Sequence, residues 1–324
     1  MAREARSELV SIDANPIPEG AQVEILNASD EVRIRAARWM SRRERGLGTV
    51  CLFQGRAEFI EKYAETVQDL LDRGFGVATL DWRGQGGSSR LASRPLRGHV
   101  GDFSHYQRDL DVFMRDFVLP GCRPPYYVLA HSMGGAIALM GARRRQTWFD
   151  RMVLTAPLLG LPGIFGSGLA RTAASLMAAA GMRTAYVPGL GGDSITAMEP
   201  FDANILTSDR DRYVRAARLV AAAPELAIGA PTVGWARAAF RAIEAMADRD
   251  FAPAVRTPTL MLMAGSEKVV DNAAIQRLAV RMRTARAVRI HGAHHELLME
   301  TDPIRDQVLA AFDAFVPGTQ VFAD

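Results

Sequence analysis

The segment Ala130-His131-Ser132-Met133-Gly134 places a serine between two small residues, each two positions away. The apolar run Tyr126–Ala130 before it predicts a strand, and Met133–Arg145 after it has the composition of a helix. In a strand–turn–helix of this kind the serine occupies a sharp turn, and its hydroxyl projects beyond the sheet. The pattern therefore indicates that Ser132 is the nucleophile of an acyl-transfer reaction.

A serine hydroxyl needs a general base, and in this arrangement the base follows late in the chain. The segment His291–Glu296 supplies the candidates: His295 is our choice, and His294 is the reserve. Adjacent histidines also raise the possibility of a metal site. The chain has no His-Glu-x-x-His spacing, so we expect no metal here.

An acid that orients the histidine is expected after the preceding strand, which we place at Pro258–Ala264. Glu267 lies just beyond that strand and is the preferred acid. Asp271 is the reserve, and its competing role is that of an N-cap for the next helix.

Two backbone N–H groups are expected to bind the developing oxyanion. Met133 follows the nucleophile and supplies one of them. The other is expected from Arg56, in the loop after the apolar run Thr49–Phe53, where Gly55 permits a close approach of the backbone. The Arg56 side chain is either a surface group or a phosphate ligand, and the sequence leaves both open.

A glycine-rich loop, Asp81–Ser88, follows the predicted strand Gly76–Leu80. It lacks the Lys-Ser/Thr ending of a phosphate-binding loop and does not lead directly into a helix. We interpret it as support for the rim of the active site.

Alternating strand and helix patterns predict an α/β fold, a mostly parallel sheet with helices on both faces. Residues 1–156 and 250–324 form this core, with residues 1–20 as an extended leader. Residues 157–249 show helical patterns without a clear strand and are expected to form a cap or lid over the carboxyl ends of the strands. The remaining elements are expected as strands at 22–26, 32–39, 152–155 and 288–290, and as helices at 59–71, 103–118, 273–282 and 303–315.

Composition excludes several function classes. Of the 324 residues 48% are hydrophobic, enough for a large core, and a net charge of +3 spread along the chain gives no reason to expect nucleic acid as a partner. The chain contains no run of about 18 apolar residues that would predict a membrane span. No apolar stretch follows the charged residues at the start of the chain, so no signal peptide is expected. With only Cys51 and Cys122, the chain has no disulfide framework, and a cytoplasmic location is expected. The sequence does not indicate the oligomeric state.

Taken together, these segments resemble the monoacylglycerol-lipase-like branch of the α/β-hydrolases, and within it the bacterial lysophospholipases. The resemblance covers roughly residues 20 to 316. It departs from the usual pattern at Gln54, where many members have histidine, at Ala130, where glycine is usual, and in having glutamate as the acid. The matching stretches are Gln54–Glu58, Leu80–Gly86, Gly98–Val100, Leu129–Gly135, Arg210–Tyr213, Gly229–Thr232, Glu267–Asn272 and Gly292–Glu296.

The resemblance implies cleavage of one acyl ester of a lysophospholipid without a cofactor, with Ser132, Glu267 and His295 as the triad and Arg56 and Met133 as oxyanion donors. The alternatives are a monoacylglycerol lipase or broad carboxylesterase, and, more remotely, an inactive hydrolase-like binding protein.

The segment Leu158–Met182 would hold the acyl chain, or simply pack as a helical core. The cap could also contact the inner face of the membrane. Arg171, Arg212 and Arg215 would then either attract anionic headgroups or form a solvated face.

Overall fold

The computed structural model describes residues 7–145, 147–192 and 199–316. An eight-stranded sheet with the order β1-β2-β4-β3-β5-β6-β7-β8 forms its centre. The pairs β1–β2 and β2–β4 are antiparallel, and all other neighbours are parallel. The strands are β1 (Gln22–Asn27), β2 (Arg33–Trp39), β3 (Thr49–Phe53), β4 (Gly76–Leu80), β5 (Tyr126–His131), β6 (Arg151–Thr155), β7 (Thr259–Ala264) and β8 (Ala285–Ile290).

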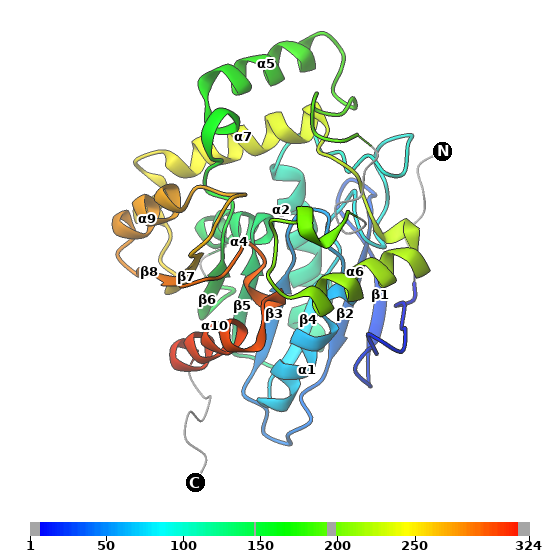
Figure 1. Cartoon of the computed structure of the whole chain (residues 1–324). Coiled ribbons are helices and arrows are strands. Elements are labelled where there is room, and N and C mark those ends of the chain that lie inside the picture. The colour runs from blue at the N-terminus through cyan, green and yellow to red at the C-terminus, as the bar shows by residue number, and fades with distance from the viewer. Residues whose placement is uncertain (1–6, 146, 193–198, 317–324) are drawn as a thin grey trace.

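Helices cover both faces of this sheet, as predicted. Figure 1 shows α1 and α10 in front of the strands and α2 and α4 behind them. The helices are α1 (Ala64–Asp72), α2 (Ser104–Val112), α3 (Leu119–Gly121), α4 (Met133–Arg144), α5 (Gly168–Ala179), α6 (Arg210–Ala222), α7 (Val233–Ala247), α8 (Phe251–Ala254), α9 (Asn272–Arg281) and α10 (Asp302–Phe315).

The expected elements form with small changes at their ends. The helix expected at 59–71 begins as a 3₁₀ turn, Ile60–Tyr63, and the one expected at 103–118 ends in a π-type turn, Phe113–Val118. The strand expected at 288–290 spans six residues, Ala285–Ile290, and β8 lies at the edge of the sheet. Its partly exposed residues include arginines, which hide the alternation from a search for apolar runs.

Residues 7–20 contain no helix or strand, in keeping with an extended leader, but they are not detached from the core. The Asn15 side chain is buried and donates a hydrogen bond to the Glu61 carbonyl at 2.9 Å. The Val10 N–H donates to the Glu61 carboxylate at 3.1 Å, and Leu9 packs against the core. This segment is therefore part of the folded structure.

The chain between β6 and β7, residues 156–258, is called the inserted segment here, and its described residues form helices α5, α6, α7 and the short α8 but no strand. In Figure 1 α5 and α7 lie together above the sheet, at its carboxyl edge, and α6 crosses in front of the upper ends of the strands. Residues from all three helices line one cavity with Ser132. Helices α5, α6 and α7 therefore share this cavity with the nucleophile candidate.

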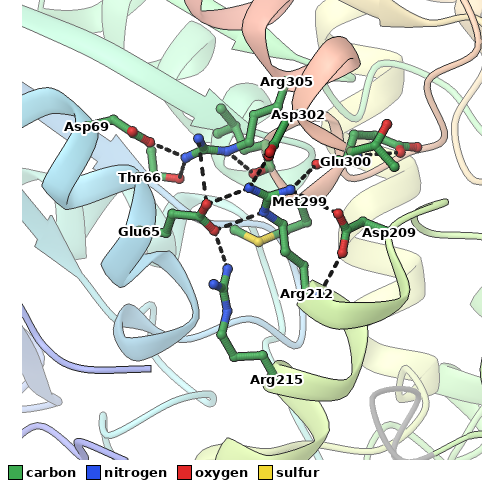
Figure 2. A network of polar contacts seen from close by, with 12 residues as sticks. Glu65, Thr66, Asp69, Asp209, Arg212, Arg215, Met299, Glu300, Asp302 and Arg305 are labelled. Atoms are coloured by element: carbon green, nitrogen blue, oxygen red, sulfur yellow. Dashed lines mark hydrogen bonds and ion pairs between the residues drawn. The ribbon is translucent and has the colours of Figure 1, made fainter. Parts of the chain in front are cut away.

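Arg212 of α6 fastens the inserted segment to the core (Figure 2). Its guanidinium binds both oxygens of Glu65 in α1, at 2.5 and 2.9 Å, and the carboxylate of Asp302 at the start of α10, at 2.7 Å. It also donates to Asp209 in its own helix cap and to the Glu300 carbonyl. Only 10% of the Arg212 side chain is exposed, so this cation is a structural clamp.

Neighbouring arginines extend the cluster. Arg215 also binds Glu65, and Arg305 of α10 binds Asp69 of α1. Burial raises the pKa of Glu65, but hydrogen bonds from Arg212 and Arg215 outweigh it and lower the pKa to about 2. Both expectations for Arg212 and Arg215, headgroup attraction and a solvated face, are therefore wrong, because core carboxylates hold these cations.

We expect Arg212→Met to lower the free energy of unfolding by about 1 to 3 kcal/mol, because Glu65 loses its two-pronged partner and keeps only Arg215 as a close cation. Chemical denaturation followed by circular dichroism measures this. Arg171→Met is the matched control: Arg171 pairs with Glu244 on the exposed side of the same inserted segment, so its loss should cost no more than about 0.5 kcal/mol. Equal costs for the two variants would contradict the clamp.

Candidate active site

Ser132 lies in the sharp turn between β5 and α4 that the sequence predicts. Its backbone has φ 50° and ψ −114°, a conformation that a non-glycine residue rarely adopts. Its N–H donates to the Thr155 carbonyl at 3.0 Å, which helps to hold the turn. Gly134 is required because a Cβ there would stand 2.5 Å from the Phe53 carbonyl oxygen. The turn therefore directs the Ser132 hydroxyl away from the sheet.

The three residues expected to form a triad meet. His295 Nε2 is 3.1 Å from Ser132 Oγ, and His295 Nδ1 is 2.9 and 3.0 Å from the two Glu267 oxygens. All three are shielded from solvent, with 9% of Ser132 and 4% of His295 exposed, and 2% of the Glu267 side chain. This is the geometry in which a histidine removes a serine proton while a carboxylate orients the ring.

Glu267 stays ionised in this shielded position. Burial raises the pKa of its carboxyl, but hydrogen bonds from His295 and from the N–H groups of Val269 and Val270 outweigh burial, so the pKa lies below its usual value. The carboxylate can therefore stabilise positive charge on the ring of His295.

Among the described residues, neither reserve side chain forms a hydrogen bond with Ser132 or with the His295 ring. Asp271 is the N-cap of α9, accepting a hydrogen bond from the Ala273 N–H at 2.8 Å. His294 donates its backbone N–H to Glu300 at 2.7 Å, and its Nδ1 is buried without a hydrogen-bond partner in the described chain. The capping alternative for Asp271 is confirmed.

The two expected oxyanion donors border Ser132. A Cβ on Gly55 would lie 3.2 Å from the Ser132 Cβ, so the loop after β3 touches the turn after β5. Among the described residues, the N–H groups of Arg56 and Met133 have no hydrogen-bond acceptor. A carbonyl oxygen bound beside Ser132 would supply one.

A buried polar network beside this loop was missed in the sequence. Glu58 accepts hydrogen bonds from the Gly55 N–H at 2.5 Å, from Tyr63 at 2.8 Å and from Lys62 at 2.9 Å. Lys62 also binds Glu296, next to His295, at 2.6 Å. The spacing of Glu58 and Lys62, one helical turn apart, was the available signal.

The charges of this network set its ionisation. Burial raises the pKa of Glu58, but Lys62 and the hydrogen bonds to Glu58 lower it to about 2. Burial raises the pKa of Glu296, and Lys62 only partly offsets this. Glu58 is thus the carboxylate that fixes the backbone of Gly55, and with it the loop that carries the Arg56 N–H.

The glycine-rich loop after β4 supports this region, in line with our interpretation. Gln85 donates to the carbonyls of Gly55 and Glu58 at 2.8 and 2.9 Å, and Trp82 donates to the Gln54 carbonyl at 3.1 Å. The glycine-rich loop thereby holds in place the loop after β3, which carries the Arg56 N–H.

His131 is a second histidine at the site, its ring centroid 4.7 Å from that of His295. Burial lowers the pKa of His131 to about 4, so its ring is neutral at physiological pH. Its Nδ1 lies 3.1 Å from the Thr155 hydroxyl, and the ring packs beside the triad without carrying charge.

An apolar cavity of about 850 Å³ opens over Ser132. The inserted segment supplies most of its wall, and the polar groups gather near the nucleophile. Apolar lining residues from this segment include Leu161, Phe165, Leu169, Met177, Val187, Leu190, Val220 and Trp235. Cavities of this kind bind ligands that are mostly apolar with one polar end.

Two further findings bear on the class of site. In the part of the chain that the structure describes, no group of three or more His, Cys, Asp or Glu residues is arranged to hold a metal ion. None of the described helices is long and apolar enough to cross a membrane.

Known proteins resemble this chain over most of its length. A model of the family described as serine aminopeptidase, S33, matches residues 45–302. The chain is 37% identical over 298 residues to lysophospholipase L2 of Escherichia coli strain K12, covering 88% of this chain and 84% of that protein. It is 25% identical over 288 residues to phospholipase YtpA of Bacillus subtilis, covering 86% and 98%.

Among solved structures, a soluble variant of monoglyceride lipase from Saccharomyces cerevisiae superposes with a TM-score of 0.73 at 17% identity, covering 95% of this chain and 99% of that one. At this identity the likeness concerns the fold alone. The comparisons confirm the resemblance that the sequence motifs suggested, and the expected hydrolase class.

If the triad acts as its geometry suggests, Ser132→Ala should lower kcat by a factor on the order of 10⁶, and Glu267→Gln by a factor on the order of 10⁴. Hydrolysis of a short p-nitrophenyl ester measures both. Asp271→Asn is the control: asparagine can still cap α9, and kcat should stay within about twofold of wild type. A large loss in Asp271→Asn with little loss in Glu267→Gln would assign the acid to Asp271 instead.

Proposed function

The chain belongs to the serine aminopeptidase S33 family of α/β-hydrolases, and from this we propose that it cleaves the carboxylic ester of a lysophospholipid and releases a fatty acid. The observation that carries the proposal is the hydrogen-bonded series Ser132–His295–Glu267 at the base of a large apolar cavity. The family name refers to peptidases, but an apolar cavity of this size favours a long acyl chain over a peptide.

The reaction has two steps. Ser132 Oγ attacks the ester carbonyl while His295 Nε2 takes its proton, and Glu267 stabilises the resulting imidazolium. The N–H groups of Arg56 and Met133 bind the oxyanion, each contributing about 3 kcal/mol to stabilising the transition state. His295 then protonates the departing glycerol oxygen. Water, activated by the same histidine, hydrolyses the acyl-serine and frees the fatty acid.

Residues 157–249 act as a cap in this proposal, and residues 1–156 and 250–324 form the core. The wall contributed by α5, α6 and α7 would receive the acyl chain, and each methylene transferred from water contributes about 0.8 kcal/mol. The other possibility for Leu158–Met182, a closed helical core, has less support because Leu161, Phe165 and Leu169 all line the cavity.

A monoacylglycerol lipase is the second candidate, because it would use the same triad and the same apolar wall. The similarity to lysophospholipase L2 over 88% of the chain supports the first candidate. An inactive binding protein has little support, because such a protein would not need three aligned, buried triad groups.

Fatty-acid release from lysophosphatidylcholine and from monoacylglycerol, assayed side by side, tests the function. We expect wild type to release fatty acid from the lysophospholipid with the higher kcat/KM, and Ser132→Ala to release none from either. Higher kcat/KM for monoacylglycerol would favour the glyceride lipase. Hydrolysis of neither lipid would rule out the lipid assignment and direct attention to small soluble esters.

Peripheral contact with the inner membrane surface belongs to the same proposal. Several large apolar side chains of the cap face solvent: Ile164 is 72% exposed, Leu169 79%, Leu176 66% and Met182 45%. They lie in or next to α5 and the 3₁₀ turn before it, in the part of the chain above the sheet in Figure 1. An apolar patch of this kind can enter the interfacial layer of a bilayer, next to the substrate.

We expect the double variant Leu176→Glu, Met182→Glu to bind anionic phospholipid vesicles several-fold more weakly than wild type, because glutamate is repelled by anionic headgroups. Co-sedimentation with phosphatidylglycerol-containing vesicles measures the bound fraction. Val288→Glu, on the edge strand β8, replaces an apolar residue that is 44% exposed and lies away from α5, and it should leave binding unchanged. Equal effects of the two changes would argue against a specific membrane face.

A further inference from the structure

Arg56 carries a partly buried guanidinium that has no acidic partner among the described residues. Its Nη2 donates to the Gly229 carbonyl at 2.8 Å, and its Cζ lies 5.1 Å from the centre of the Trp235 ring. Its Nε is buried and has no hydrogen-bond partner, and its Nη1 makes no hydrogen bond, among the described residues. No described aspartate or glutamate forms an ion pair with it.

Two arginines in the core lie between pairs of carboxylates, whereas the buried Arg90 donates to backbone carbonyls. Arg35 lies between Glu61 and Asp81, and Arg83 lies between Asp30 and Asp109. Burying a cation without a counter-charge costs free energy. The missing counter-charge therefore sets Arg56 apart from Arg35 and Arg83. Burial lowers the pKa of Arg56 to about 10, which still leaves the group protonated at neutral pH.

The location of Arg56 indicates what the charge is for. Arg56 is one of the residues that line the cavity above Ser132, and its N–H is the proposed oxyanion donor. The guanidinium therefore lies within one side-chain length of the reacting carbonyl. In a lysophospholipid the three glycerol carbons separate the ester from the phosphate, a comparable span.

The other cations that line the cavity are less suited to an anionic ligand. Lys62 is held between Glu58 and Glu296, and Arg212 is held by Glu65 and Asp302. Lys268 is exposed and follows the triad acid. Arg56 combines enclosure with an unmatched charge, and stacking on Trp235 orients its planar fork in advance.

We propose that the guanidinium of Arg56 binds the phosphate of the substrate headgroup and so makes the enzyme select lysophospholipids over uncharged monoacylglycerols. This inference rests on the proposed function and assigns its specificity to one side chain. The competing role is structural: through Gly229 and Trp235, Arg56 also ties the inserted segment to the loop after β3.

Kinetics of Arg56→Met and Arg56→Lys on two substrates with the same acyl chain separate these roles. We expect Arg56→Met to raise KM for lysophosphatidylcholine about 10-fold to 100-fold more than KM for monoacylglycerol. This is the factor expected from losing a hydrogen bond to a charged group. Arg56→Lys should restore part of the difference. A purely structural Arg56 would change both substrates by the same factor, which would overturn the inference.

Lys268→Met is the matched control, since it removes the other cavity cation that has no acidic partner in the described chain. Its ratio of KM values for the two substrates should stay that of wild type. A shift in the ratio with Lys268→Met and none with Arg56→Met would place the headgroup site beside Lys268 instead.

Calorimetric titration with sn-glycerol 3-phosphate, inorganic phosphate and glycerol gives a test that does not require turnover. We expect glycerol 3-phosphate to bind wild type at least tenfold more tightly than Arg56→Met, and glycerol to bind neither. If wild type hydrolyses no lipid, the proposed function fails, yet this titration still decides whether Arg56 binds phosphate. If Arg56→Met weakens phosphate binding but leaves the substrate ratio unchanged, the site binds free phosphate only, and the headgroup role is overturned.

Discussion

The close approach of two loops, one after β3 and one after β5, is the constraint on which the rest of this site depends. At Gly134 even a methyl group would collide with the Phe53 carbonyl, and a Cβ on Gly55 would lie only 3.2 Å from the Ser132 Cβ. Because both strands are parallel neighbours, their carboxyl ends bring these loops together at one edge of the sheet. The nucleophile, the proposed oxyanion donors and the loop that carries His295 are all placed relative to this contact.

Buried charges maintain that contact from outside the triad. Asp81 receives hydrogen bonds from Arg35 and from the N–H groups of Ile60 and Gly87, so one carboxylate orders three segments of chain. Glu58 does the same on a smaller scale for the Gly55 N–H, with Lys62 as its counter-charge. Each of these pairs is well matched in geometry, which is the condition under which buried ion pairs are tolerated.

The parts of the molecule that the sequence predicts well are those encoded locally. The turn at Ser132 needs only a strand, small neighbours and a helix, all within about ten residues, and Glu267 follows its strand directly. The environment of Arg212 could not be read this way, because its partner Glu65 is 147 positions away in the chain and only the fold brings them together. Arg212, Arg215 and Arg56 are alike in the sequence, and their different surroundings arise from tertiary contacts alone. The edge position of β8 is hidden for the same reason.

The separation of the triad along the chain also has a kinetic meaning. The contact between Ser132 and His295 joins residues 163 positions apart, with the whole inserted segment between them. Closing such a long loop is slow compared with forming the turn at Ser132 or helix α4, which are local. Hydrolytic competence is therefore among the last properties that the folding chain acquires. A partly folded chain would carry the strained serine with neither its base nor its acid.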